Sequence, residues 1–130
     1  MRALVLAFLF FLVMVQAADP GLAGTFTGEW KSNGDGGRAY NMTLQQTGGI
    51  WKADVSFNAA GEDIKAAVKD VKAAGTKLDI TYTFATQGVE LAGKASGELK
   101  GVQLTGTYQS LVAEGGMVID EGTWTAARTK

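Results

Sequence analysis

The sequence contains no cysteine, no histidine and a single proline, Pro20. Without cysteine the chain has no disulfides, no acylated cysteine anchor and no thiol chemistry, so its stability depends on its core alone. Without histidine it also lacks Ser-His-Asp and Cys-His nucleophilic sites and the usual zinc ligands. We therefore expect no enzymatic activity, no metal site and no cofactor.

An excess of one charge is also missing, because 12 basic residues stand against 13 acidic ones, for a net charge of −1. The basic residues form neither a patch nor a run. Nucleic-acid-binding proteins and proteins that attach to anionic membranes carry such patches. We therefore expect neither nucleic acid nor an anionic membrane surface as a partner.

The chain has one long hydrophobic run, from Ala3 to Val15, which follows Met1-Arg2 and precedes the small residues Ala17 and Ala18. This is the layout of a signal peptide, and the run is shorter than the roughly 20 residues that span a bilayer. We expect residues 1–17 to be a cleaved signal peptide, with an uncleaved anchor as the alternative. Residues 18–130 would then be one secreted or periplasmic domain without stable membrane insertion. An exported domain without disulfides is more typical of bacteria.

Glycine-rich turns separate short segments in which apolar and polar residues alternate. Alternation with a period of two predicts half-buried antiparallel strands. We expect an all-β domain, an eight-stranded antiparallel up-and-down barrel whose closure removes exposed strand edges, with a sandwich as the alternative. The expected strands are about 24–31, 38–46, 50–57, 66–73, 77–86, 88–99, 102–110 and 117–128.

Residues 62–74 fit two patterns. Ile64, Ala67, Val68, Val71 and Ala74 have helical spacing. We favour a strand over 66–73, because the neighbouring segments need an antiparallel connection. One short helical turn within 62–74 is compatible with either interpretation.

The aromatic residues that follow the leader all fall on predicted inner faces, which indicates one shared interior. This interior is either a filled core or a pocket walled by Tyr40, Trp51, Tyr82 and Tyr108, in which the phenol hydroxyls of the tyrosines would serve as polar groups. Small inner residues such as Gly93 and Gly97 leave room either for a ligand or for large rings opposite. The inner aromatic residues are Phe26, Trp30, Tyr40, Trp51, Phe57, Tyr82, Phe84, Tyr108 and Trp124.

Gly28-Glu29-Trp30 in the first predicted strand and Trp124-Thr125-Ala126-Ala127-Arg128 in the last resemble the Gly-x-Trp opening and late arginine of the lipocalin/avidin group of small barrels. The resemblance covers the chain after the leader. It implies that Trp30 plugs one barrel end and that Arg128 packs across it in a cation–π contact. It also implies a binding role, but not biotin binding, because the polar residues of the biotin site have no counterpart.

These observations favour an exported, non-enzymatic barrel that binds a small, largely apolar molecule in its open end. The alternative is a structural or interaction module of the cell envelope, with a filled core and a surface that binds a protein or a glycan. A third hypothesis is a hydrolase, which needs two inward carboxylates. However, the acidic residues within the predicted strands alternate with inward apolar residues and should face solvent: Glu29, Asp54, Asp79, Glu90 and Glu98.

Overall fold

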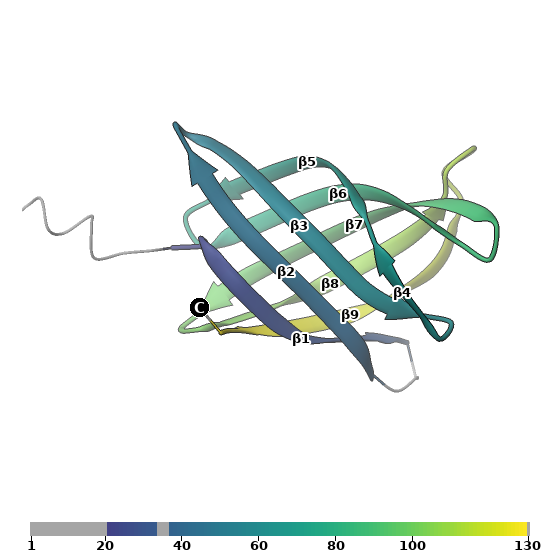
Figure 1. Ribbon diagram of the computed structural model, residues 1–130, viewed down its shortest axis with the longest axis horizontal. Helices are drawn as coiled ribbons and strands as arrows, with labels where there is room; N and C mark the ends of the chain where they lie inside the picture. Colours follow the sequence, from purple (N-terminus) through teal and green to yellow (C-terminus); the bar gives the residue numbers. More distant parts are fainter. Residues whose placement is uncertain (1–20, 34–36, 130) are drawn as a thin grey trace, which may run out of the picture.

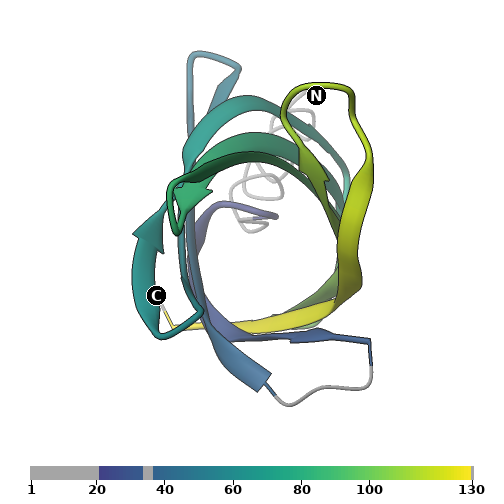
Figure 2. The same ribbon diagram turned by 90° about the vertical axis from the view of Figure 1, so that its right-hand side faces the viewer.

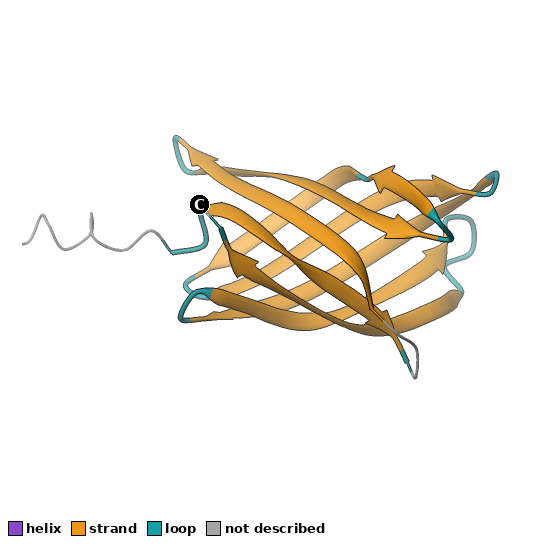
Figure 3. Ribbon diagram, turned by 60° about the horizontal axis from the view of Figure 1, so that its bottom comes forward, coloured by secondary structure: helices purple, strands orange, loops and turns teal. Residues whose placement is uncertain are grey.

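The computed structural model describes residues 21–33 and 37–129, so the predicted signal peptide lies outside the described residues. This part of the chain contains strands and turns but no helix (Figure 3). One antiparallel sheet curls into a barrel, which is seen from the side in Figure 1 and end-on in Figure 2. Its strands are β1 (Gly24–Ser32), β2 (Gly37–Thr47), β3 (Ile50–Ala59), β4 (Glu62–Lys65), β5 (Ala67–Ala74), β6 (Lys77–Thr86), β7 (Val89–Lys100), β8 (Gln103–Val112) and β9 (Val118–Arg128).

The strands follow the chain around the barrel, and the first strand also pairs with the last. The order in the sheet is β4-β3-β2-β1-β9-β8-β7-β6-β5. In the β1–β9 register Phe26 lies opposite Arg128, and Trp30 lies opposite Trp124. This arrangement confirms the predicted all-β, antiparallel, up-and-down barrel.

The strand count is nine rather than eight because the segment over residues 62–74 changes partner midway. β4 pairs with β3, whereas β5 pairs with β6. The change occurs at Ala66, whose backbone N–H donates to the carbonyl oxygen of Val55 at 2.9 Å. The segment therefore joins β3 to β6 near one barrel end, while the beginning of β3 and the rest of β5 flank an open groove.

The helical alternative for this segment is wrong, and a β-bulge explains why the pattern was ambiguous. Ile64, Ala66 and Val68 follow the period of two, and the register then shifts between Val68 and Asp70. The next inward side chain is therefore Val71, three residues after Val68, and Val68 and Val71 both pack against the core. One extra residue in a strand thus gives the spacing of a helix.

The barrel interior has two halves of different character. At the end where the chain enters β1 and leaves β9, here called the closed end, aliphatic side chains and Phe26 fill the interior. The opposite end, here called the open end, carries the turns at residues 60–61, 87–88 and 113–117. The residues that fill the closed end are 0–1 % exposed: Leu22, Phe26, Met42, Leu44, Leu78, Ile80 and Leu104.

Two of the turns at the open end are two-residue hairpins. Ala60-Gly61 and Gln87-Gly88 have φ values of 54° and 79°, and of 51° and 77°. Successive left-handed residues form the type I′ turn, which matches the twist of antiparallel strands. These turns fix the register of β3 with β4 and of β6 with β7, and thereby the height of the inward side chains at the open end.

Candidate functional site

The open end holds a cavity of about 160 Å³ between the last inward side chains of the strands. A cavity of about 150 Å³ with apolar walls is large enough to bind a benzene-sized molecule. The lining combines large aromatic rings with a few hydroxyl groups and one carboxylate. It consists of Trp30, Tyr40, Phe57, Ala59, Tyr82, Phe84, Thr86, Leu91, Tyr108, Ser110, Ile119, Asp120 and Trp124.

Three of the four predicted pocket residues come together in this cavity. Tyr40, Tyr82 and Tyr108 reach it from β2, β6 and β8. Trp51 does not, because it lies at the start of β3, near the closed end, and lines the groove between β3 and β5. Alternation identifies the inner face of a strand but not the height along the barrel, so the expectation for Trp51 was wrong.

The inner glycines of β7 make room for the rings of the cavity wall. A Cβ atom at Gly93 would collide with the Tyr82 ring, and one at Gly97 would lie 2.6 Å from Cζ2 of Trp124. At both positions the added Cβ atom would be far closer to the ring than van der Waals contact allows. The small residues therefore accommodate large side chains, and the empty volume lies beyond those rings, toward the open end.

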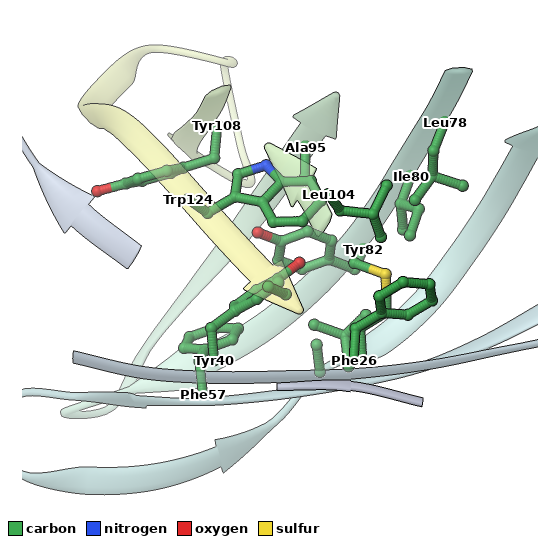
Figure 4. Packing of buried hydrophobic residues seen from close by; sticks show 14 of the residues in the cluster. Phe26, Tyr40, Phe57, Leu78, Ile80, Tyr82, Ala95, Leu104, Tyr108 and Trp124 are labelled. Atoms are coloured by element: carbon green, nitrogen blue, oxygen red, sulfur yellow. The ribbon is translucent and has the colours of Figure 1, made fainter. Parts of the chain in front are cut away.

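Contacts between neighbouring rings hold the wall in place. The Trp30 and Tyr108 rings meet edge to face, with centroids 5.6 Å apart, and the Tyr40 and Trp124 centroids are 5.2 Å apart. The Trp30 indole N–H donates to the carbonyl oxygen of Asn58 at 2.9 Å. Figure 4 shows the Tyr40, Tyr82 and Trp124 rings close together in the interior. A wall that is already packed binds a ligand without ordering its own side chains.

Asp120 supplies a carboxylate to the cavity that the sequence interpretation missed. Tyr108 Oη donates to Asp120 Oδ2 at 2.9 Å, and Ser32 Oγ donates to Asp120 Oδ1 at 2.5 Å. The sequence does place Asp120 on the inner face of its strand, because Asp120, Gly122 and Trp124 follow one another at a spacing of two residues. The same period places Ser32 on the face of Trp30.

The tyrosine hydroxyls give the cavity polar but uncharged groups. The Tyr40 hydroxyl is buried and has no hydrogen-bond partner within the described chain. Burial raises the pKa of Tyr40 well above its usual value, with a smaller contribution from Tyr82, and raises the pKa of Tyr82 to about 12. Burial, together with the hydrogen bond to Asp120, also raises the pKa of Tyr108. All three phenols therefore remain protonated at neutral pH.

Arg128 has a structural role near the closed end and Gly28 has one midway along β1, whereas Trp30 lies at the open end. The Arg128 guanidinium lies over the Phe26 ring, 4.9 Å from its centroid, and donates to the carbonyl oxygens of Gly21, at 2.7 Å, and Ala23. A Cβ atom at Gly28 would collide with the backbone of β9, so β1 and β9 approach closely there.

The expected pairing of Trp30 with Arg128 was therefore wrong. The strand register places Phe26 opposite Arg128, and Trp30 lies four residues further along β1, in the cavity at the open end. Gly-x-Trp fixes the spacing of residues along a strand, but it does not identify the barrel end at which the tryptophan lies.

The carboxylates that the sequence placed outside are exposed at Glu29, Asp54, Asp79 and Glu90, and Glu98 is half-buried. Among the described residues, Asp120 is the one carboxylate that lines the cavity. No group of three or more acidic residues in this part of the chain is arranged to hold a metal ion.

Within residues 21–33 and 37–129, no helix is long and apolar enough to cross a bilayer. Comparison with models of known protein families, with curated proteins and with solved structures gives no match for this chain.

Proposed function

We propose that the protein is an exported, non-enzymatic barrel that binds a small, largely apolar molecule in its open end. The observation that carries the proposal is the difference between the two halves of the interior. Aliphatic side chains fill the closed end, whereas rigid aromatic rings surround a cavity of about 160 Å³ at the open end. Small-molecule sites have such apolar walls with a few polar groups that orient the ligand.

The unpaired hydroxyl of Tyr40 supports this proposal. A buried hydroxyl without a partner costs about 1–3 kcal/mol of stability, and most buried polar groups in proteins are paired. Tyr40 lines the cavity, so the unpaired hydroxyl belongs to a residue of the candidate site. Export rests on the signal-peptide pattern of residues 1–17.

A direct test measures binding of naphthalene and indole to residues 18–130 by calorimetric titration. Ala59 lines the cavity, and Ala85 lies exposed on the outer face of β6. Ala59→Trp places a large ring in the cavity, and Ala85→Trp adds the same ring outside it. We expect Ala59→Trp to weaken binding by about tenfold or more, which corresponds to about 1.4 kcal/mol. Ala85→Trp should retain wild-type affinity; equal affinities for both variants would contradict the proposal.

A second candidate, an interaction module that binds an envelope protein or a glycan, is favoured by the apolar residues around the open end. Val89, Met117, Val118 and Ile119 are 42–66 % exposed. A partner-binding surface of this kind would be disrupted by Met117→Glu and would be insensitive to Ala59→Trp. The two variants therefore distinguish the candidates.

A further inference from the structure

The cavity at the open end carries charge of one sign. Its one ionisable group besides the phenols is Asp120, and no lysine or arginine is among the described residues that line it. The chain contains no histidine. The cavity therefore offers a carboxylate without a basic side chain to neutralise it.

The hydrogen bonds to Asp120 leave its charge available. Both donors, Tyr108 Oη and Ser32 Oγ, are neutral hydroxyls, and each uses one lone pair of a different carboxylate oxygen. An ionised carboxylate has about four acceptor positions. The two hydroxyls thus fix the orientation of the carboxylate, and further acceptor positions remain for a ligand.

The aromatic walls add negative potential of their own. The face of an aromatic ring attracts a cation within about 6 Å of its centroid, and tryptophan does so most strongly. Trp30 and Tyr108, which touch each other edge to face, line the cavity together with Asp120. The two rings meet at an angle of 82°, so their faces point in different directions.

The outer surface near the open end carries exposed charges of both signs, whereas the cavity itself carries only a negative one. Lys31, Arg38 and Lys65 are exposed, and none of them lines the cavity. Clefts of one sign raise the association rate of ligands with the opposite charge. The exposed acidic residues beside the described turns at this end are Glu62, Asp63, Glu90 and Glu114.

We propose that the ligand is a small organic cation, an amine or quaternary ammonium compound with an apolar substituent. Its charged group would lie between Asp120 and the rings of Trp30 and Tyr108. Its apolar part would contact deeper rings such as Phe57 and Tyr82. This inference rests on the proposed function and specifies the class of ligand that the same cavity binds.

The test compares two probes of the same shape and different charge. Phenyltrimethylammonium and tert-butylbenzene are titrated calorimetrically into residues 18–130 at low salt. We expect the cation to bind about tenfold more tightly than the neutral hydrocarbon, because the aromatic faces and the carboxylate both favour the charged probe. Equal or tighter binding of the hydrocarbon overturns the inference but leaves the proposed function standing. If neither probe binds, the inference is overturned, and the titrations with naphthalene and indole decide separately whether the proposed function stands.

Two matched variants locate the source of the preference. Asp120→Asn removes the charge inside the cavity and retains the oxygen acceptor, whereas Glu121→Gln removes a charge from the next residue, which is exposed. We expect Asp120→Asn to reduce the cation preference about fivefold or more and Glu121→Gln to leave it unchanged. An unchanged preference in Asp120→Asn, or an equal reduction in both variants, contradicts the assignment.

A third variant addresses the case in which Asp120→Asn does not fold. Trp30→Leu removes an aromatic face and keeps an apolar side chain at a partly buried position. It should also reduce the ratio of the two affinities, and an unchanged ratio would overturn the role of the rings.

Discussion

Replacement of Phe26 by alanine should destabilise the barrel more than replacement of Trp30. Phe26 is 0 % exposed, and the Arg128 guanidinium lies over its ring. Removal of a buried phenylalanine ring costs about 3–5 kcal/mol, and loss of the cation–π contact adds about 0.5–1 kcal/mol. Trp30 is only partly buried, and its replacement removes one edge-to-face contact and one hydrogen bond. These contribute about 1 kcal/mol each, and the apolar surface that Trp30 buries against the core adds about 1 kcal/mol more.

Urea denaturation of the two variants, followed by circular dichroism, measures this difference. We expect a loss of about 4–5 kcal/mol for Phe26→Ala and about 3 kcal/mol for Trp30→Ala. In a thermal melt the Phe26 variant should unfold roughly 15–20 °C below the wild-type protein, at about 4 °C for each kcal/mol. A larger loss for Trp30→Ala would indicate that Trp30, and not Phe26, plugs the barrel, and would refute the structural reasoning.

Three further predictions concern packing, titration and turns. Gly97→Ala should destabilise the protein by about 1–3 kcal/mol in urea denaturation, because the new methyl group would overlap the Trp124 ring; a neutral effect would show that the ring is free to move. The three tyrosines of the chain should show no rise in absorbance at 295 nm until the pH is well above 10 or the protein unfolds, since burial raises all three pKa values, that of Tyr82 to about 12. The contribution of Tyr82 to the free energy of unfolding is fully present below about pH 10, the pKa of tyrosine in the unfolded chain. It is lost by about 1.4 kcal/mol per pH unit as the pH rises to about 12. Titration of the tyrosines at their ordinary pKa in the folded protein would contradict their burial. Ala60→Asn and Gln87→Asn, which create Asn-Gly turns at residues with φ of 54° and 51°, should each raise stability by about 0.5–1 kcal/mol in thermal melts; a loss would contradict the type I′ assignment.

The fold was accessible from the sequence because half-buried strands give a direct signal. Alternation identified the inner face of each strand, and all the aromatic residues on predicted inner faces are buried or partly buried in the structure. The bulge at Lys69 could not be predicted, because one extra residue in a strand leaves no characteristic amino-acid pattern. The extra strand β4, which precedes the predicted strand at 66–73, depends on pairing with β3, whereas β5 pairs with β6.

The candidate site was only partly accessible, because it depends on height along the barrel as well as on face. Tyr40, Tyr82 and Tyr108 share the cavity with Trp30, whereas Trp51 has the correct face at the wrong end. Height follows from the register between paired strands, which places Tyr40 opposite Phe57 and Trp30 opposite Trp124. Asp120 was missed although it alternates in step with the inward residues Gly122 and Trp124, because the inner face was predicted from apolar residues alone.

The central claim is that the open end of the barrel binds a small molecule, and native mass spectrometry tests it most directly. The protein is isolated from the cells that make it, and its native mass is compared with its mass after denaturation. We predict a reproducible excess mass that disappears on denaturation and is absent from Ala59→Trp isolated in the same way. Equal native and denatured masses, in a preparation that also fails to bind naphthalene, indole and phenyltrimethylammonium, would contradict the claim.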